Sequence, residues 1–568
     1  MLLFILGLAY RATFISQGFN ASDEGFLPAL ALRIGRGQVA YRDFYYASPP
    51  LTLFKEAAVA YLLGPSYGFL ASRWVFAVEV SLGSVIAFLI VRRFASPTVA
   101  FFATLPTIFF TTILYAYSNF NFDAQILFLA AFLIVVWQIE RERWPLMLLA
   151  GVLCGLAFLS KPTYLGMAVG MCGLGLLRPL TAGPRRWPIF AAGFVLVVGG
   201  VFLAIFGVGL WDQFRHQSFG QLLEARPVSK RQLIYQDWPK WLLETGHGIV
   251  APGAAAALIG AAAYLRRVAS VLIGILGIVL AAIVLPALPT STQGIPTNGQ
   301  MGLLVGALAL VLAINVFASV LTVAARLPGV STRPWAAAVR TQMFPPMVPI
   351  VAAVLEYLHG VDLSSMRFAY VGTFLGVPVA LCFLYMLWPA VAGAVRVRIA
   401  APAVVGAFVA LAGIVITHGS PYLDGPREQM TATFGAQRLA GISTVPANAS
   451  HVDGVVSQIV EKTAPGDRTF IFPDGQAYYV LTGRNNPTKV DWYDILATTP
   501  AMTAEALDVL KRDPPQWIFV QEYNESDINH TSRLDFASQA AWQPIFDFIT
   551  ASYELVSSAG GVDIYRLK

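Results

Sequence analysis

The chain has 568 residues, of which 57% are hydrophobic and only 12% are charged, and its net charge is +6. Soluble globular chains carry about 25% charged residues, so this composition excludes a single water-soluble core and indicates a membrane protein. The basic residues occur in short clusters between apolar runs. That pattern is typical of cytoplasmic loops and argues against a nucleic-acid-binding surface.

Apolar runs predict a series of membrane helices along most of the chain. Met1 to Ile15 is interpreted as the first helix and not as a cleavable signal peptide, because no small-residue cleavage site follows. A polar, aromatic loop, 17–72, comes next, and its amphipathic run Leu51 to Leu63 suits the membrane interface. The further spans bring the total to about thirteen. They are predicted at 73–91, 97–115, 123–139, 145–160, 163–177, 188–210, 247–264, 269–288, 301–323, 343–358, 367–390 and 399–417.

Arginines in the connections predict the orientation. With the first loop outside, every inside connection holds at least two arginines, whereas the short outside connections hold few basic residues. The inside arginines are Arg92 and Arg93; Arg141 and Arg143; Arg178, Arg185 and Arg186; Arg266 and Arg267; Arg326, Arg333 and Arg340; and Arg396 and Arg398. This bias predicts a multi-pass protein of the cell (inner or plasma) membrane with a cytoplasmic N-terminus. An odd number of spans places the C-terminal domain outside the cytoplasm.

The composition divides the chain into a membrane region, 1–418, and a C-terminal domain of ordinary polarity, 419–568. A second long outside loop, 211–246, interrupts the membrane region. In the C-terminal domain we expect strands at Arg468 to Pro473 and Trp517 to Gln521, helices at Glu428 to Leu439, Val452 to Thr463 and Thr503 to Lys511, and a terminal hairpin of Tyr553 to Ser558 and Val562 to Leu567. The predicted fold class is a polytopic α-helical membrane protein with a small C-terminal extracytoplasmic α/β domain.

Two adjacent carboxylates, Asp23 and Glu24, come directly after the first helix. Ionisable groups close to a membrane are costly and are often functional. Asp23 could equally cap the helix that follows it. The residues alone leave both interpretations open.

Two further ionisable residues stand at the outside ends of predicted spans. Asp123 closes a short outside loop where a span begins, and helix capping is the favoured interpretation for that residue taken alone. Lys161 lies between two apolar segments, with Pro162 fixing the turn. It could snorkel to the interface or hold an anionic group there.

Arginines of the two outside loops are the remaining candidates. Arg42 lies among aromatic residues of the first loop, and Arg226 and Arg231 lie in the second. They could form an anion site or a solvated face. The sequence shows no phosphate-binding glycine loop, nucleotide fingerprint or catalytic-triad motif, and its histidines and cysteines lack metal-ligand spacing.

Four motifs in the first half of the chain together resemble the GT-C superfamily of membrane glycosyltransferases, in particular its aminoarabinose transferase and protein O-mannosyltransferase-like members. The motifs are the Asp23-Glu24 pair, YRDFYYASPPL from Tyr41, NFDAQ from Asn121 and GLAFLSKPT from Gly155. The resemblance implies transfer of a sugar from a polyprenyl-phosphate-linked donor to a lipid, glycan or protein acceptor on the outer face. Tyr478 to Pro487 also resembles a stretch of bacterial relatives, and is otherwise interpreted as packing against the membrane region.

The resemblance also implies roles. Asp23 would be the general base that deprotonates the acceptor, with Glu24 as its partner and Asp123 lining the same cavity. Lys161 would neutralise the lipid phosphate as it leaves. Some relatives place a phosphate-binding lysine before the second proline of the first loop. This chain has Ser48 and Pro49 there, so Lys55, Arg42 or a residue of 226–231 would have to substitute.

Two other classes of function remain. A transporter or flippase for a lipid-linked sugar or cell-envelope polymer should show internal repeats and charges within spans. No repeat is visible, and the acidic residues singled out above lie at helix ends. A scaffold would not account for several polar residues on one side. We expect no cofactor: Asp23 and Asp123 could share a divalent metal, but we do not predict one. Membrane lipid is an expected partner, and nucleic acid is not.

Overall fold

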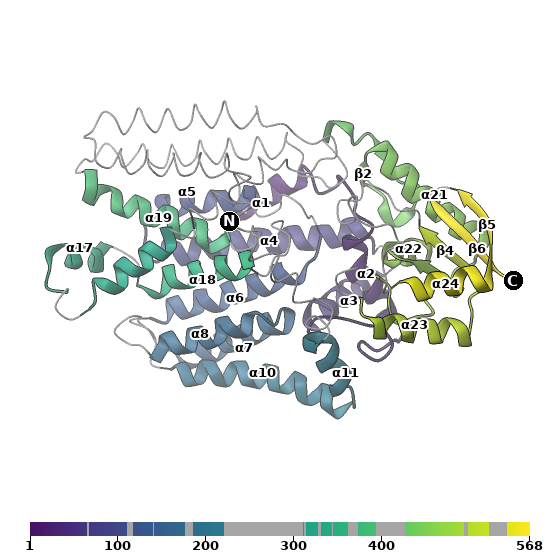
Figure 1. Ribbon diagram of the computed structural model, residues 1–568. Coiled ribbons are helices and arrows are strands. Elements are labelled where there is room, and N and C mark those ends of the chain that lie inside the picture. The colour runs from purple at the N-terminus through teal and green to yellow at the C-terminus, as the bar shows by residue number, and fades with distance from the viewer. Residues whose placement is uncertain are drawn as a thin grey trace.

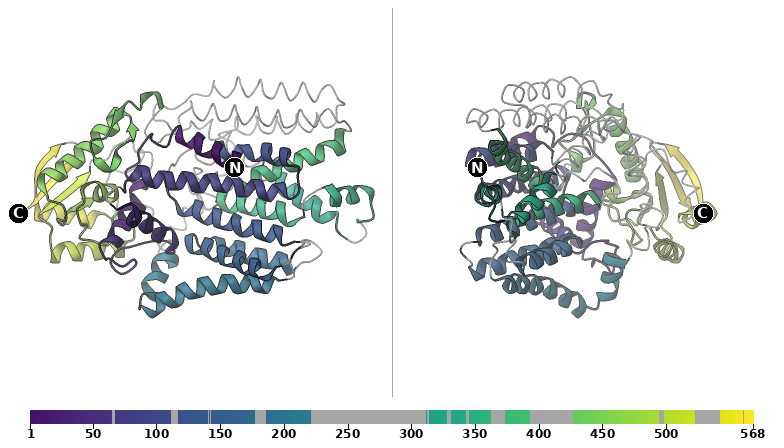
Figure 2. Two further views of the ribbon diagram at one scale, coloured as in Figure 1. Left: turned by 180° about the vertical axis from the view of Figure 1, so that it is seen from behind. Right: turned by 60° about the vertical axis from the view of Figure 1, so that its left-hand side comes forward.

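The computed structural model describes residues 1–64, 67–110, 117–139, 143–176, 186–220, 314–327, 331–342, 345–361, 373–392, 427–493, 498–521, 542–559 and 561–568, with the single residues 141 and 311. The described residues up to 392 are mainly helical. The long helices run side by side, and a C-terminal unit lies at one end of them. The short helices α2 and α3 lie between the long helices and this unit (Figures 1 and 2). The helices are α1 (Leu2–Ala12), α2 (Asp23–Gly35), α3 (Leu51–Leu63), α4 (Phe69–Arg92), α5 (Pro97–Phe110), α6 (Phe120–Trp137), α7 (Trp144–Ser160), α8 (Tyr164–Leu176), α10 (Trp187–Gly207), α11 (Trp211–Arg215), the π-helix η2 (His216–Gly220), α17 (Pro334–Gln342), α18 (Met347–Val361) and α19 (Thr373–Ala392).

Three of the described helices, α4, α6 and α10, are long and apolar enough to cross a membrane. Each coincides with a predicted span, and the shorter apolar helices α1, α5, α7 and α8 coincide with others. The total of about thirteen spans stays a prediction. The predicted spans 247–264, 269–288 and 399–417 and most of 301–323 lie outside the described residues.

Glycines let two of the long helices approach backbone to backbone. A Cβ added at Gly151 of α7 would lie 1.9 Å from the Phe190 carbonyl oxygen of α10. One added at Gly193 of α10 would lie 2.2 Å from the Leu148 oxygen. Small residues at such crossings are the usual means of helix association in a membrane, where no hydrophobic force drives it.

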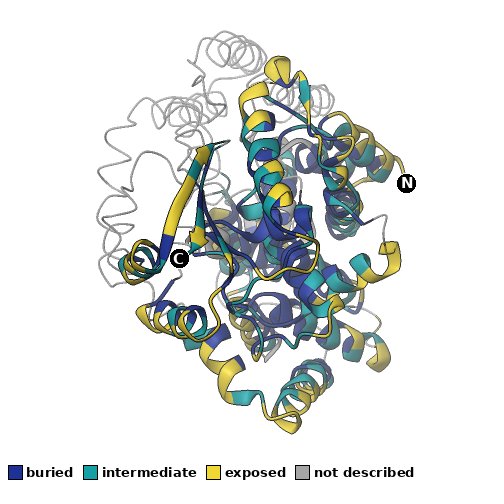
Figure 3. Cartoon of the chain, turned by 90° about the vertical axis from the view of Figure 1, so that its right-hand side faces the viewer, coloured by how far each residue is buried: buried dark blue, intermediate teal, exposed yellow. Residues whose placement is uncertain are grey.

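The described residues from 427 onward form the C-terminal unit, a sheet covered by helices on both faces. Strands β3 and β4 are parallel, and β4, β6 and β5 continue antiparallel in the order β3-β4-β6-β5. Alternate strand residues pack on α21 and α22 on one face and on α23 and α24 on the other. Figure 3 shows the buried residues gathered in the centre. The elements are η4 (Arg427–Gln429), β1 (Ala432–Thr433), η5 (Gln437–Leu439), β2 (Ser443–Thr444), α21 (Pro446–Lys462), β3 (Phe470–Phe472), α22 (Gln476–Thr482), α23 (Pro500–Arg512), β4 (Trp517–Gln521), α24 (Gln543–Ser552), β5 (Tyr553–Ala559) and β6 (Val562–Leu567).

Most elements predicted in this unit are confirmed, including the terminal hairpin, but the prediction of a helix at Glu428 to Leu439 is wrong. The chain there forms two short 3₁₀ turns and the strand β1. Gly435 and the β-branched Thr433 disfavour a helix. The amide of Gly435 is instead held by the Asp453 carboxylate at 2.8 Å. The next helix starts earlier than predicted, at Pro446, a residue suited to a first helical position.

Helix α2 joins the two parts. A Cβ added at Gly25 would lie 2.4 Å from the backbone nitrogen of Ala477, so α2 lies directly on α22. Arg33 forms two hydrogen bonds of 3.0 Å to the Asp491 carboxylate, and both side chains are buried. The Tyr478 to Pro487 stretch therefore packs against the membrane region, as the alternative interpretation of its sequence held.

Candidate active site

Asp23 is the first residue of α2 and is half-buried. The side-chain oxygen of Asn20 accepts hydrogen bonds from the backbone nitrogens of Ser22 (2.9 Å) and Asp23 (3.2 Å). Asn20 therefore supplies the hydrogen bonds that satisfy the first amides of this helix. The Asp23 carboxylate is not needed for that task.

A carboxylate of the C-terminal unit lies beside this helix start. Ser22 donates a hydrogen bond of 2.9 Å to Asp474, which is buried on the loop after β3. Gln476 donates to the Ser22 carbonyl at 2.7 Å, and Gln521 donates to the Asp474 carbonyl at 2.6 Å. Our sequence reasoning missed Asp474. Its signal was the position directly after the carboxyl end of a buried strand.

Glu24 points to a different partner. Its two oxygens lie 2.6 and 2.8 Å from Nε and Nη2 of Arg73 on α4, and both side chains are buried. Arg73 also donates to the carbonyl oxygens of Ile15 (2.7 Å) and Gly18 (2.5 Å). Through Arg73, Glu24 and the chain segment before Asp23 are tied to α4. Both carboxylate oxygens of Glu24 are already engaged in this contact.

Asp123 lies in the first turn of α6 and is tied to Lys55 of α3. The Lys55 ammonium lies 2.6 Å from Asp123 Oδ1 and 2.9 Å from both oxygens of Glu79 on α4. Burial disfavours the charged ammonium, but the two carboxylates outweigh it, so the pKa of Lys55 is raised. The capping interpretation of Asp123 is wrong, because Asn119 caps α6 by accepting from the Asn121 amide at 2.8 Å.

Glu79 corrects our expectation that acidic residues occur only at helix ends, since it lies inside α4. A lone ionisable residue within a predicted span was a readable signal. Glu79 and Lys55 together complete a charge cluster of which the motifs had indicated only Asp123.

Lys161 ends α7 and is buried, so it does not snorkel to the interface. Its ammonium lies 2.5 Å from the side-chain oxygen of Asn121 at the start of α6. Lys161 and Asp123, which were predicted separately, therefore meet at the first turn of α6: Asp123 is part of this turn, and Lys161 is bonded to it through Asn121. Lys55 reaches the same turn from α3.

Buried polar atoms without partners mark the same region. Within the described part of the chain, Oδ2 of Asp123 and the hydroxyl of Tyr46 are buried and have no hydrogen-bond partner. Burial is the main reason why the pKa of Tyr46 is raised, and the charge of Asp123 raises it further. The two groups are therefore electrostatic neighbours. An unsatisfied buried polar group costs about 1–3 kcal/mol, which a bound hydroxyl group would offset.

The first and second loops are clasped together beside this cluster. Gln217 of η2 accepts from the Tyr46 amide at 3.0 Å and donates to the Tyr41 carbonyl at 2.8 Å. Tyr41 has φ +69°, a strained conformation for a residue that is not glycine. Such strain, about 1–3 kcal/mol, persists only where surrounding contacts hold it, and it gathers at functional sites.

Of the candidate arginines, only Arg42 is among the described residues, and it does not join this cluster. Arg42 is exposed and pairs with its neighbour Asp43 at 2.9 Å. Its hydrogen bond to the Asp43 carboxyl lowers the pKa of that carboxyl to about 2. Arg226 and Arg231 lie outside the described residues. In the described ranges no three His, Cys, Asp or Glu side chains gather as a metal site would require, and the Lys55 ammonium occupies the place beside Asp123 where a cation would bind.

Comparison with known proteins gives a likeness of fold. No family model matches the sequence, and no curated protein matches it. Among solved structures, the archaeal oligosaccharyltransferase AglB from Archaeoglobus fulgidus, in complex with an inhibitory peptide and a dolichol-phosphate, has a TM-score of 0.50 at 13% identity, over 91% of this chain and 69% of that one. ArnT from Cupriavidus metallidurans bound to undecaprenyl phosphate has a TM-score of 0.42 at 12% identity, over 99% and 96%. The chain shares its fold with the archaeal oligosaccharyltransferase AglB, which agrees with the membrane-glycosyltransferase fold that its four motifs predicted.

Proposed function

We propose that the chain is a glycosyltransferase that moves a sugar from a polyprenyl-phosphate-linked donor to an acceptor on the outer face of the membrane. The observation that carries the proposal is the buried ammonium of Lys161, anchored with the half-buried Lys55 at one turn of α6 next to the unpartnered oxygen of Asp123. The buried Lys161 ammonium suits a ligand that carries a phosphate. The similar AglB structure is a complex with a dolichol-phosphate.

In the proposed reaction, the acceptor hydroxyl attacks the anomeric carbon of the sugar and Asp23 takes its proton. The bond between that carbon and the phosphate oxygen breaks, and the oxygen leaves with the electron pair as polyprenyl phosphate. Lys161 stabilises the negative charge that develops on this phosphate. Asp123 accepts a hydrogen bond from a sugar hydroxyl, and Tyr46 donates one to a sugar hydroxyl. Both use the atoms that otherwise lack partners.

Lys55 has a different part. An ammonium has three N–H donors, and the contacts to Asp123 and Glu79 occupy them. We propose that Lys55 positions the Asp123 carboxylate, while Lys161 contacts the phosphate. Glu24 is a positioning residue as well, because Arg73 holds both of its oxygens. We propose no substrate contact for Arg42.

A transporter or flippase for a lipid-linked sugar remains the second candidate, and Glu79 inside α4 is the observation that favours it. Purified protein in vesicles, given a panel of labelled polyprenyl-phosphate sugars and envelope glycans, separates the two. A transferase releases polyprenyl phosphate and labels the acceptor. A flippase moves the intact donor between leaflets and releases no phosphate.

The same assay tests the phosphate contact. Lys161→Met should raise the donor KM by about 10- to 100-fold, the usual loss for a charged hydrogen bond. Arg42→Gln serves as the matched control and should leave KM unchanged. Equal KM values for wild type and Lys161→Met would remove Lys161 from the phosphate site.

A further inference from the structure

A polar groove of about 510 Å³ lies where the end of α2 meets the C-terminal unit. Its volume is within the range of about 300–1,000 Å³ typical of small-molecule sites. The groove is distinct from the candidate active site, and the proposed reaction does not use it. It is lined by Arg36, Gln38, Gly466, Arg468, Asn485, Asn486 and Pro487.

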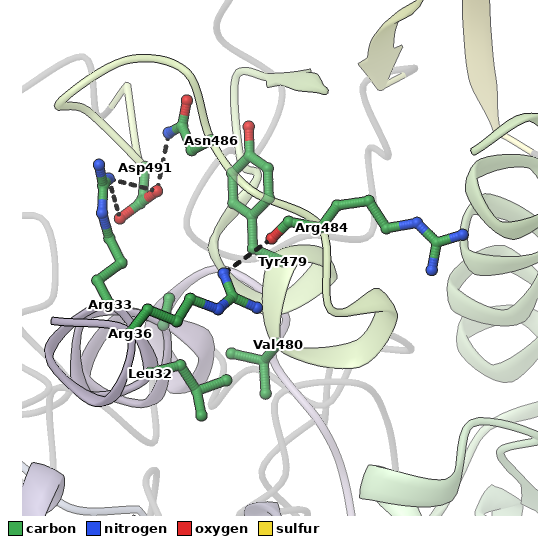
Figure 4. A pocket seen from close by; sticks show the side chains of 9 residues that line it. Leu32, Arg33, Arg36, Tyr479, Val480, Arg484, Asn486 and Asp491 are labelled. Carbon is green, nitrogen blue, oxygen red and sulfur yellow. Dashed lines mark hydrogen bonds and ion pairs between the residues drawn. The ribbon is translucent and has the colours of Figure 1, made fainter. Parts of the chain in front are cut away.

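Arg36 is held in the groove wall by neutral oxygens. Its guanidinium donates to Asn485 Oδ1 at 2.7 Å and to the carbonyl oxygens of Arg484 (3.1 Å) and Gly483 (3.2 Å). Figure 4 shows it reaching from α2 to the Arg484 backbone. Among the described residues, Arg36 has no carboxylate within salt-bridge distance. A guanidinium has five N–H donors, so this cation is fixed in place, is not neutralised and retains donors.

Arg468 brings a second guanidinium to the groove. It is exposed and forms an ion pair with Asp513, the residue that follows α23. This pair is accessible to solvent, so a competing anion can displace it at small cost. The two arginines give the groove a positive character that Asp513 only partly offsets.

The amides between the arginines are fixed by their own hydrogen bonds. Asn485 donates to the Gly466 carbonyl at 2.7 Å, and Asn486 donates to Asp491 at 2.8 Å. Gln38 accepts from Arg33 at 2.6 Å. Walls that are already ordered lose little conformational entropy when a ligand binds.

The lining identifies the ligand class. Guanidinium groups match carboxylate and phosphate oxygens in a two-pronged geometry. Amides bind hydroxyl groups. Pro487 is the only apolar side chain in the groove lining, so a lipid tail or an apolar peptide would gain little there. A carbohydrate that carries an acidic group satisfies all of these requirements.

The place of the groove relative to Asp23 gives it a role. Asp23 is the first residue of the 13-residue helix α2 and Arg36 directly follows that helix, so the two residues are 13 positions apart. At 1.5 Å per residue this helix spans about 20 Å. A ligand in the groove is therefore too far from Asp23 to be the sugar that reacts.

We propose that the groove around Arg36 and Arg468 binds the acidic part of a glycan acceptor, about one helix length from the hydroxyl that receives the sugar. The word acceptor rests on the proposed function, whereas the binding of an acidic glycan does not. Because α2 is one rigid element packed on α22, a glycan seated in the groove is held in a defined relation to Asp23.

The test is equilibrium binding of two fluorescent probes to the full-length protein in detergent. One probe is an oligogalacturonate, which carries a carboxylate on each sugar, and the other is an uncharged malto-oligosaccharide of the same length. We expect saturable binding of the acidic probe that weakens as salt is added. Equal affinity for the two probes would overturn the proposal.

Variants give the direction of each effect. Arg36→Gln and Arg468→Gln should each weaken binding of the acidic probe by about tenfold. Asp513→Asn should strengthen it by a few-fold, since it removes the carboxylate that competes for Arg468. Arg566→Gln changes an equally exposed arginine, which pairs with Glu554 on the outer hairpin, and should have no effect. Because Arg36 also joins α2 to the C-terminal unit, the exposed Arg468 and Asp513 carry the test if Arg36→Gln fails to fold.

The outcome separates this inference from the proposed function. If the acidic probe binds with the expected variant pattern while no donor is transferred, the groove stands and the transferase proposal fails. If sugar transfer is found but Arg468→Gln and Asp513→Asn bind the acidic probe as wild type does, the groove assignment is wrong.

Discussion

The ammonium of Lys55 lies 2.6 Å from the carboxylate of Asp123, and so a helix of the first loop is fastened to the first turn of α6. The second carboxylate oxygen of Asp123 has no partner in the described part of the chain. The contact fixes the direction of one oxygen and leaves the other for a ligand. In the proposed reaction that ligand is a hydroxyl of the donor sugar.

Asp123→Asn should therefore slow sugar transfer by about 10- to 100-fold, the loss expected for one hydrogen bond to a charged group. The initial rate with a labelled polyprenyl-phosphate sugar measures it. Asp43→Asn is the matched control, because Asp43 is a first-loop carboxylate that pairs with the exposed Arg42. Wild-type rates for Asp123→Asn would show that this oxygen does not contact substrate.

Glu24→Gln should act on stability. Breaking a buried ion pair by neutralising one partner costs about 3–5 kcal/mol, and the side chains of Glu24 and Arg73 are each only 3% exposed. We expect a lower thermal midpoint in detergent and a lower yield. A variant of normal stability that transfers no sugar would instead support the role as partner of Asp23 that the family resemblance implied for Glu24.

Substitutions at two glycines of α2 distinguish the effect of packing on stability from the effect of helix propensity. Gly25→Ala places a methyl group against the backbone of Ala477 and should destabilise the contact between α2 and α22 by about 1–3 kcal/mol. Gly35→Ala meets no atom within 4 Å and should be neutral, or stabilising by up to about 1 kcal/mol. Hydrogen exchange in α2 and α22 reports the difference, and equal protection in both variants would contradict the docking described above.

The burial of His451 predicts that the C-terminal unit loses stability at acid pH. Burial lowers the pKa of its imidazole, and Nδ1 lies against Gly561 at the turn into β6. Because the folded state favours neutral imidazole, its contribution to stability is complete above the ordinary pKa of about 6.5 and is lost as pH falls through that value toward the lowered pKa. After correction for the intrinsic pH dependence of amide exchange, the protection of β6 should fall as the pH is lowered from 7 to 5 in wild type, and should fall less in His451→Asn. Identical pH profiles would exclude His451 as the cause.

Local pattern was sufficient to predict much of the fold. The apolar runs that became α4, α6, α7, α8 and α10 and the buried strands β3 and β4 could be read directly, because period and composition decide them. The segment of η4 and β1 could not, since the Asp453 contact that holds Gly435 comes from a residue 18 positions away.

The candidate site divides in the same way. Asp23, Asp123 and Lys161 stood out because charged residues at the ends of apolar runs are visible in one dimension. The partners were not visible: Arg73 for Glu24, Lys55 for both Asp123 and Glu79, and Asn121 for Lys161. Each pair joins two different helices, so only packing reveals which charge is already engaged and which atom remains for a substrate.

The central claim is that Asp23 is the base of a lipid-linked sugar transfer, and one measurement tests it most directly. Membranes containing wild type, Asp23→Asn or the control Asp43→Asn, at matched expression, are given a labelled polyprenyl-phosphate sugar, and acceptor labelling is followed. Loss of a general base lowers the rate by about 10²- to 10⁴-fold, so we predict that loss for Asp23→Asn alone, with donor binding retained. Acceptor labelling at the wild-type rate by Asp23→Asn would contradict the account.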